Sequence, residues 1–337
     1  MNTVPDEPTG PDEPTGPDEP TVRAAVSLAT RAPSIHNSQP WRWRLAENSV
    51  HLFADTSRML PATDPDGRDL LLSCGATLHH LRVALAAQGW ATTVTRLPNP
   101  NQPNHLAAIQ FHQQAPSAQD IALASVIQHR RTDRRRFSSW AVPPSLLGDL
   151  TKLAAEQGAV LLPTTDPIDR FKLTMAIAQA ALEQETNPDY TNELATWAGR
   201  SSLSLEGVPA SNTPAHDTHH DDTTMRTFPH GTLTQPPAED QNDAGELLIL
   251  ATATDEPISR LHAGEAMSVV LLAATDFQLA TCPLSQVLEI RATRELVRTR
   301  ILDGFGYPQI ILRIGWAPAE NPPVPETPRR ALTEVFG

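Results

Sequence analysis

The sequence lacks several features, and each absence excludes a class of protein. Cys74 and Cys282 are its only cysteines and form no CxxC or zinc-type spacing, so we expect a reduced compartment. No apolar run reaches the roughly 18 residues of a membrane span, and no basic-then-apolar signal pattern opens the sequence. These absences predict a cytoplasmic protein with no membrane partner.

Basic charge is also scarce. The chain carries 26 lysines and arginines against 39 aspartates and glutamates, which gives a formal net charge of −13. Binding of nucleic acid depends largely on a basic surface that neutralises phosphates. We therefore expect no nucleic-acid partner, and any basic patch has to be local.

The composition changes along the chain and suggests its organisation. Residues 1–21 are dominated by an acidic, proline-rich PDEPTG repeat and are predicted to form a disordered tail. Residues 207–245 are rich in Pro, Thr, Asp and His with little apolar periodicity, which is typical of a lid-like or disordered insert. Elsewhere the periodicity predicts helices near residues 22–32, 68–89, 118, 142, 258–280 and 289–303, and strands near residues 41–45, 91–97, 106–111, 247–251 and 309–315.

Two of the predicted helices resemble each other. When Gly75 is placed over Gly264, an offset of 189 residues, apolar residues three and six positions further on also match. Each helix also runs into a small-residue turn and a strand. So few matches in Ala/Leu-rich helices also arise by chance, so duplication and coincidence both stay open.

Two polar segments are candidates for chemistry. Residues 33–40 offer hydroxyl, imidazole and amide groups suited to the edge of a flavin ring, although an ordinary helix-to-strand connection can have the same composition. Residues 130–136 hold five arginines and one aspartate. Guanidinium groups match phosphate oxygens, although such a run is more often a solvated basic face.

The histidines predict no metal site. His216–Asp222 resembles a metal-binding cluster by composition, but its setting favours a solvated loop without metal. His79 and His80 lie within an apolar helix, where such residues are more often packed than catalytic.

Several segments together resemble one family. Ala32-Pro-Ser-Ile-His-Asn-Ser-Gln-Pro-Trp41 resembles the APSxxNxQPW motif of FMN-dependent nitroreductases, and Arg131-Thr-Asp-Arg-Arg-Arg-Phe137 with Val142-Pro is similar to their RxSxRxF motif and its trailing VP. Ala266–Ala274 resembles their dimer-interface helix, and Pro308–Gly315 their PxxxxxxG strand. Gly264-Glu265, Pro283-Leu-Ser-Gln286 and Thr327-Pro-Arg-Arg330 resemble the Acg-type branch. The resemblance covers most of residues 22–337.

The order of the two main motifs departs from the family pattern. In ordinary members the arginine motif precedes APSxxNxQPW within one subunit, whereas here it follows. The resemblance implies an α+β, tandem-duplicated nitroreductase-like fold, a pseudo-dimer in one chain whose halves are mainly antiparallel sheets flanked by helices. The halves would be residues 22–125 and 126–337. Since each keeps the motif that the other lost, one FMN per chain is expected.

The resemblance also implies a set of cofactor-binding residues. Arg131 and Arg135 would hold the FMN phosphate. Asp133 stands where the family has serine, so we expect it to orient an arginine while Thr132 supplies the hydroxyl. The remaining expected contacts are Ser34, His36, Asn37, Gln39, Pro283, Leu284, Ser285 and the tail residues Arg329 and Arg330.

The activity implied is that of an oxidoreductase that passes hydride through flavin N5 from NAD(P)H to a nitroaromatic, quinone or similar small acceptor. No catalytic side chain is expected, since the flavin carries the chemistry. No GxGxxG or Walker motif is present, so NAD(P)H would bind as a transient donor. Two alternatives stay open: an FMN-sequestering or storage protein with residues 207–245 as a lid, and a flavinless interaction protein that keeps the fold. The choice of NADH or NADPH and the pairing of two chains into a homodimer also stay open.

Overall fold

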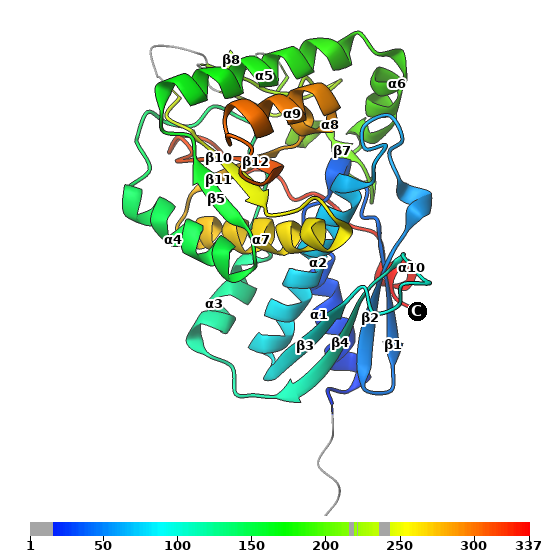
Figure 1. Cartoon of the computed structure of the whole chain (residues 1–337). Coiled ribbons are helices and arrows are strands. Elements are labelled where there is room, and N and C mark those ends of the chain that lie inside the picture. The colour runs from blue at the N-terminus through cyan, green and yellow to red at the C-terminus, as the bar shows by residue number, and fades with distance from the viewer. Residues whose placement is uncertain (1–15, 216–218, 221, 236–242) are drawn as a thin grey trace, which may run out of the picture.

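A computed structural model describes residues 16–215, 219–220, 222–235 and 243–337. Two four-stranded antiparallel sheets lie on either side of two long helices that cross between them (Figure 1). One large hydrophobic core includes buried residues from both sheets and both helices. The chain is therefore α+β, and its two sheets share one core.

The first sheet has the strand order β1-β2-β4-β3. Along β1 the buried Trp41 and Trp43 alternate with the exposed Arg42 and Arg44, because successive side chains of a strand point to opposite faces. One face of this sheet therefore packs on the core while solvent covers the other. Its strands are β1 (Trp41–Ala46), β2 (Ser49–Ala54), β3 (Trp90–Arg96) and β4 (His105–Gln113).

The second sheet has the order β11-β12-β10-β5 and, apart from its edge strand β5, is covered on both faces. Leu248 and Leu250 of β10 join the large core, whereas Leu247 and Ile249 join a second cluster with residues of α5, α8 and α9. This explains why β10 and β12 are almost continuously apolar. The strands are β5 (Val160–Pro163), β10 (Glu246–Thr252), β11 (Ala280–Leu284) and β12 (Tyr307–Gly315).

The crossing helices are α2 (Arg68–Ala87) and α7 (Pro257–Asp276), and they meet at two glycines. A Cβ added to Gly75 would lie 2.2 Å from the Leu261 carbonyl oxygen, and one added to Gly264 would lie 2.1 Å from the Leu72 carbonyl oxygen. Only glycine permits this approach. Within the described part of the chain, α2 is the one helix long and apolar enough to span a membrane, but 78% of its apolar window is buried, as in the core helix of a soluble protein.

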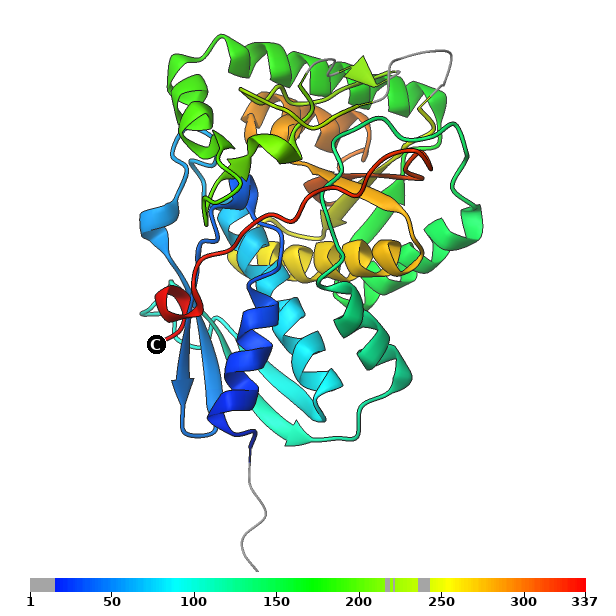
Figure 2. The same ribbon diagram turned by 180° about the vertical axis from the view of Figure 1, so that it is seen from behind.

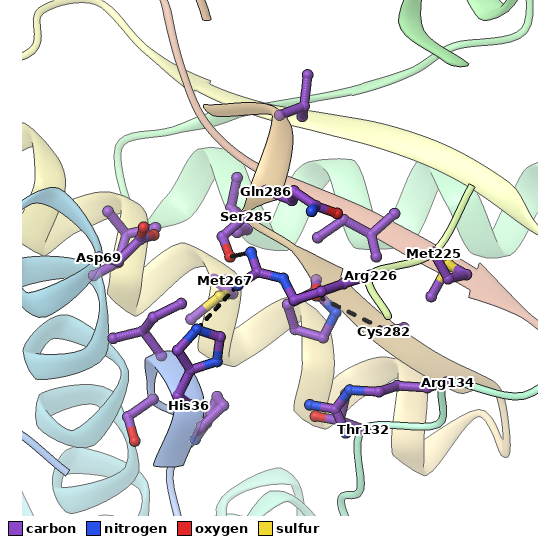
Figure 3. Close-up of a pocket in the computed structure, with 18 of the residues that line it drawn as sticks. His36, Asp69, Thr132, Arg134, Met225, Arg226, Met267, Cys282, Ser285 and Gln286 are labelled. Carbon is purple, nitrogen blue, oxygen red and sulfur yellow. Dashed lines mark hydrogen bonds between the residues drawn. The ribbon is translucent and has the colours of Figure 1, made fainter. Parts of the chain in front are cut away.

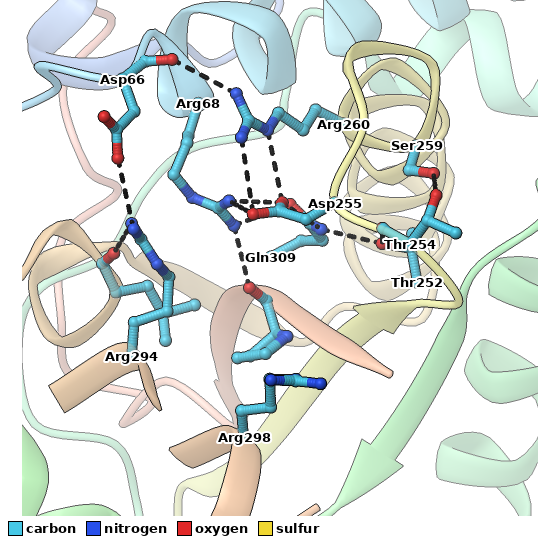
Figure 4. Close-up of polar contacts among 12 residues, drawn as sticks. Asp66, Arg68, Thr252, Thr254, Asp255, Ser259, Arg260, Arg294, Arg298 and Gln309 are labelled. Atoms are coloured by element: carbon cyan, nitrogen blue, oxygen red, sulfur yellow. Dashed lines mark hydrogen bonds and ion pairs between the residues drawn. The ribbon is translucent and has the colours of Figure 1, made fainter. Parts of the chain in front are cut away.

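A polar cluster ties the start of α2 to the second sheet (Figure 4). Arg68 pairs with Asp255 and donates to Gln309 Oε1 at 3.0 Å. Arg260 reaches the same Asp255 carboxylate at 3.3 Å, and Arg294 of α9 reaches Asp66 at 3.3 Å. These contacts fix the position of the N-terminal end of α2 relative to α7 and β12.

The predicted elements are present, with some changed ends. α1 (Glu19–Ala29) begins before Val22, because Asp18 caps it by accepting the Thr21 N–H at 2.9 Å and a proline occupies its first turn. Glu19 to Thr21 are therefore helical, although they fell in the predicted tail; residues 1–15 lie outside the described residues. The sequence reading did not anticipate β2, β5, α5 or α6.

The predicted insert, residues 207–245, holds only short elements where it is described. Strands β7, β8 and β9 have two residues each, and one 3₁₀ turn follows β7. His216–Thr218 and Asp221 of the histidine cluster lie outside the described residues. The other elements are α3 (Ala118–Val126), α4 (Pro144–Glu156), α5 (Pro167–Glu185), α6 (Pro188–Trp197), β6 (Ala198–Arg200), β7 (Val208–Pro209), β8 (His219–His220), β9 (Thr223–Thr224), α8 (Gln286–Glu289), α9 (Arg291–Arg300) and α10 (Leu332–Val335).

Candidate functional site

Two adjoining cavities lie where the halves of the chain meet. The empty volume of the larger cavity, including the open space at its mouth, is about 900 Å³, and that of the smaller is about 530 Å³. Pro33, Ser34, Thr132 and Arg134 line both, so the cavities join into one elongated site. Its walls come from the α1–β1 loop, the start of α2, residues 130–134 and the end of β11.

The α1–β1 loop holds an unusual backbone conformation. His36, Asn37 and Gln39 have positive φ angles of 46°, 54° and 51°, which non-glycine residues rarely adopt. Ser34 Oγ accepts the Gln39 N–H at 3.0 Å, and Ser73 Oγ on α2 accepts the Ile35 N–H at 3.1 Å. The loop is therefore held in place by side chains, and strain of this kind clusters at functional sites.

Arginines dominate the smaller cavity. Burial, followed by repulsion from Arg131 and Arg31, lowers the pKa of Arg130 to about 9. Nε and Nη1 of Arg130 and Nε of Arg131 are buried and have no hydrogen-bond partner. Buried donors without partners are rare, so these indicate an anionic ligand such as a phosphate. The arginines that line the cavity are Arg31, Arg130, Arg131, Arg134 and Arg329.

Arg226 lies at the centre of the larger cavity (Figure 3). It is a residue of the insert, and its guanidinium pairs with the buried Glu289 of α8 and donates to His36 Nε2 at 3.0 Å. Burial, with Arg226 and then Arg134 nearby, lowers the pKa of His36 well below its ordinary value, so its imidazole is neutral and can accept this bond. Ser285 Oγ donates to the same Glu289 carboxylate at 2.7 Å.

The walls of the larger cavity are mostly apolar. Asp69, in the first turn of α2, is an exception, and burial, followed by the Asp64 and Glu289 carboxylates, raises its pKa well above the ordinary value. A flat aromatic ligand could therefore lie between apolar side chains with polar groups at its edge. The apolar lining residues are Ile35, Leu72, Ile177, Met225, Phe228, Met267, Leu284, Val287 and Ile310.

Comparison with known sequences places the chain in a family. It is 46% identical over 321 residues to "Putative NAD(P)H nitroreductase Rv3131" of Mycobacterium tuberculosis, an alignment that covers 94% of this chain and 90% of that protein. It is 40% identical over 322 residues to "Putative NAD(P)H nitroreductase acg" of the same organism, with 94% and 95% covered. The chain belongs to the Acg-like branch of the nitroreductase superfamily. No protein-family model matches the sequence.

Solved structures give weaker likenesses to this Acg-like chain. The FMN-dependent nitroreductase NfnB from Mycobacterium smegmatis, solved with NADPH, is 16% identical with a TM-score of 0.40, covering 63% of this chain and 96% of that one. A nitroreductase with bound FMN from Bacteroides fragilis is 11% identical with a TM-score of 0.38, covering 59% and 90%. Likeness at this level carries no argument about fold or function.

Most residues expected from the motifs line the site of this nitroreductase-family chain. From both halves the structure brings together Ser34, His36, Asn37, Arg131, Thr132, Pro283, Leu284, Ser285 and Arg329. The side-chain amide of Asn37 donates to the carbonyl oxygens of Gly207 and Pro328 at 3.0 and 3.2 Å, while its side-chain oxygen Oδ1 is buried and unpaired.

Four expected residues lie outside the cavity lining. Asp133 orients Arg135 as expected, accepting its Nε and Nη2 at 2.9 and 2.8 Å, and this pairing turns Arg135 away from the site. Gln39 accepts the Arg330 N–H at 2.9 Å, and both residues join the tail to the α1–β1 loop. In this chain Arg130 and Arg134 line the smaller cavity, whereas Arg135 does not.

Several lining residues were missed from the sequence. Arg130 and Arg134 belong to the candidate run 130–136 but not to the contacts that the family motif implies, and Arg31 lies just before the loop motif, outside both candidate segments. Arg226 had no sequence signal, because the insert shows no periodicity and its pairing with Glu289 of α8 depends on the tertiary fold. Among the described residues no group of three or more His, Cys, Asp or Glu side chains is placed to bind a metal ion.

Proposed function

We propose that the elongated site binds one FMN per chain, with the phosphate in the smaller cavity and the ring in the larger. The unpaired guanidinium nitrogens of Arg130 and Arg131, buried at one end of an apolar cavity, carry this proposal. Arginine charges need an anion at that end, and the apolar walls suit a planar ring at the other. The family of the relatives points to the same cofactor.

The residues of the chain would then bind and orient the cofactor and tune its charge. Ser34 and Thr132 line both cavities, so their hydroxyls could contact the region between phosphate and ring. Arg134 has no carboxylate hydrogen-bonded to it in the described structure, so its charge would favour an anionic ring. When bound, FMN supplies hydride transfer from NAD(P)H to a small acceptor such as a nitroaromatic or a quinone.

The duplicated organisation, with halves at 22–125 and 126–337, is part of this proposal. Both sheets have one strand order when β1, β2, β4 and β3 are matched with β5, β10, β12 and β11. The crossing helices start and end 189 residues apart, and His79 bonds Ser268, its counterpart at that offset, at 2.8 Å. Reciprocal contacts between equivalent residues are typical of a two-fold interface.

Anaerobic absorbance in the visible flavin band tests the enzymatic proposal. The full chain is loaded with FMN, the bound flavin is counted, and NADPH or NADH is added before dithionite. We expect one flavin per chain and bleaching by a nicotinamide. A colourless protein that ignores added FMN, or a ratio of two flavins per chain, would contradict the proposal.

The second candidate is an FMN-sequestering protein, and one observation favours it. Thr224, Met225, Arg226 and Phe228 of the insert all line the larger cavity, and Arg226 is held there by Glu289. A segment fixed over the ring would exclude the nicotinamide. Such a protein would bind FMN and bleach with dithionite alone.

An Arg226→Ala variant separates the two candidates. If the insert excludes the nicotinamide, the variant gains NADPH-dependent bleaching that the wild-type chain lacks. Exchange of the exposed Arg291 for alanine is a matched control, because it removes an arginine at the start of α9 that lines neither cavity. No gain in the variant would count against the lid. Cytoplasmic localisation remains part of the proposal.

A further inference from the structure

Helix α5 lies on the outside of the protein (Figures 1 and 2). It carries a stripe of exposed apolar side chains. Its large members, Ile168, Phe171, Met175 and Leu182, are 65%, 64%, 55% and 66% exposed. They follow one another at intervals of three, four and seven residues, and Ala178 fills the intermediate position. This is the spacing of a coiled-coil seam, which normally packs against another helix.

A shallow apolar groove lies beside the stripe, between α5 and α9. Its empty volume, including the open space above it, is about 1060 Å³, and its lining includes Phe171, Met175, Leu182 and Leu296. Side chains of a packing helix could enter it as knobs between the ridges of α5 and α9. A monomer rarely exposes a continuous apolar surface of this kind without a partner.

The charges beside the stripe favour a second copy of the same chain. Lys172 and Arg300 line the groove toward the start of α5, and Glu183 is exposed toward its end. Lys172, Ala176, Gln179 and Glu183 share one side of the helix, because they are spaced at four, three and four residues. Lys172 also pairs with Asp169 at 2.8 Å. The lining of the groove is nonetheless basic toward the start of α5, and Glu183 is acidic toward its end, so these two ends are complementary in antiparallel orientation.

We propose that two chains associate through α5, packed antiparallel about a two-fold axis near Met175 and Ala178. Phe171 of each copy then lies against Leu182 of the other, and Lys172 approaches the opposite Glu183. An isologous contact of this kind is the commonest way in which soluble proteins form dimers. The proposal does not depend on the bound cofactor.

The dimer would bear on the candidate site, because the inner side of α5 forms part of it. Ile177 lines the larger cavity, and Gln184 donates to the Glu289 carboxylate at 2.6 Å. Arg170 of α5 also pairs with Asp222 of the insert at 2.5 Å. Burial of the outer side of α5 in an interface would therefore restrict the motion of this helix, which supports Arg226 through Glu289.

The test is sedimentation of the full chain over about a hundredfold range of concentration, with Met175→Glu as the disrupting variant. The wild-type chain is expected to be dimeric at the upper end and the variant monomeric throughout. Ile121→Glu is the matched control, since Ile121 is 54% exposed on helix α3, and it should sediment as the wild type does. A wild-type monomer over the whole range, or a dimer that survives Met175→Glu, would overturn the proposal.

Charge exchange tests the antiparallel orientation. Lys172→Glu and Glu183→Lys should each weaken the dimer, and the double variant should restore it, because the exchanged pair has the same complementarity. Thermal unfolding at each concentration checks that all the variants fold. Two single variants that dimerise normally, or a double variant weaker than both, would rule out this orientation.

Discussion

The two ends of the α2–α7 crossing differ although their frameworks match. At the end of β11, beside the start of α2, the chain leaves an open, arginine-lined cavity. At the end of β3, beside the start of α7, the corresponding volume holds a buried ion-pair cluster in which Glu265 accepts from Arg96 at 2.6 Å and from Arg82 at 2.7 Å. One framework thus gives a binding site at one end, called the open end, and a packed polar core at the other, called the filled end.

Positions that match at the offset of 189 residues carry different side chains at the two ends. Arg96 occupies the position that Ser285 has at the open end, and Glu265 occupies the position that Ala76 has there. The helix-to-strand loop at the filled end is also shorter. Only Gln157 to Ala159 connect α4 to β5, whereas the open end has the longer α1–β1 loop. Larger side chains and a shorter loop therefore account for the absence of an open cavity at that end of the described structure.

The largest effect is expected from Glu265→Ala. The Glu265 side chain is fully buried, and its removal leaves two arginines without a counter-charge. Breaking a buried pair in this way costs about 3–5 kcal/mol of unfolding free energy. Urea unfolding measures this free energy. A loss below about 1 kcal/mol, which is typical of an exposed pair, would mean that the stability of the filled end does not depend on its ion pairs.

At the open end, Arg130→Gln should weaken FMN binding by about tenfold to a hundredfold. A hydrogen bond to a charged group contributes about 1.5–3 kcal/mol, and Arg130 has two nitrogens free for the phosphate. Fluorescence titration with FMN gives the dissociation constant, and Arg291→Gln is the exposed control. Unchanged affinity in Arg130→Gln would leave the smaller cavity without its proposed ligand.

The crossing that both halves share should resist any enlargement. Gly264→Ala is expected to lower the unfolding free energy by about 1–3 kcal/mol, because the added methyl group meets a backbone carbonyl of α2. Gly148→Ala, in α4 with open space around it, should instead gain about 0.5–1 kcal/mol. Equal stability changes in the two variants would show that the helices can move apart easily.

The smallest expected effect is the pH dependence of the stability that Glu265 contributes at the filled end. Burial alone would raise the pKa of Glu265, but Arg96 and Arg82 outweigh it and hold the pKa below its ordinary 4.5. The carboxylate therefore stabilises the fold above that ordinary value, and this contribution is lost as the pH falls through the lowered pKa. Unfolding of Glu265→Gln should show a shallower acid dependence than the wild type; parallel curves would contradict this.

Sequence patterns were sufficient for α2, α7 and β12 and for the loop motif, but not for α5, although that helix is 19 residues long. The helices α2 and α7 and the strand β12 carry apolar periodicity that survives any tertiary context, and the α1–β1 loop carries a dense polar motif. Strand β5 was missed, because its four residues are too few for a pattern. The start of α1 was missed because its cap lies within a repeat that otherwise has nothing to bury.

The site could be predicted only in part, because side-chain direction decides it. Within the arginine motif, Thr132 and Arg134 face the cavity while Asp133 and Arg135 pair with each other. A one-residue change in the direction of an irregular segment reverses which arginines are available, and spacing alone cannot detect it. Arg226 needed the full fold, since its partners His36 and Glu289 are far away in the sequence.

The crossing at Gly75 and Gly264 joins two parts of a single polypeptide, and this has a consequence for dilution. A site built between separate subunits comes apart when the protein is scarce, since its assembly depends on concentration. Here the walls from both halves are covalently connected, so their effective concentration is fixed by the chain itself. The cavity should therefore stay intact at copy numbers at which an assembly of separate subunits would already have dissociated.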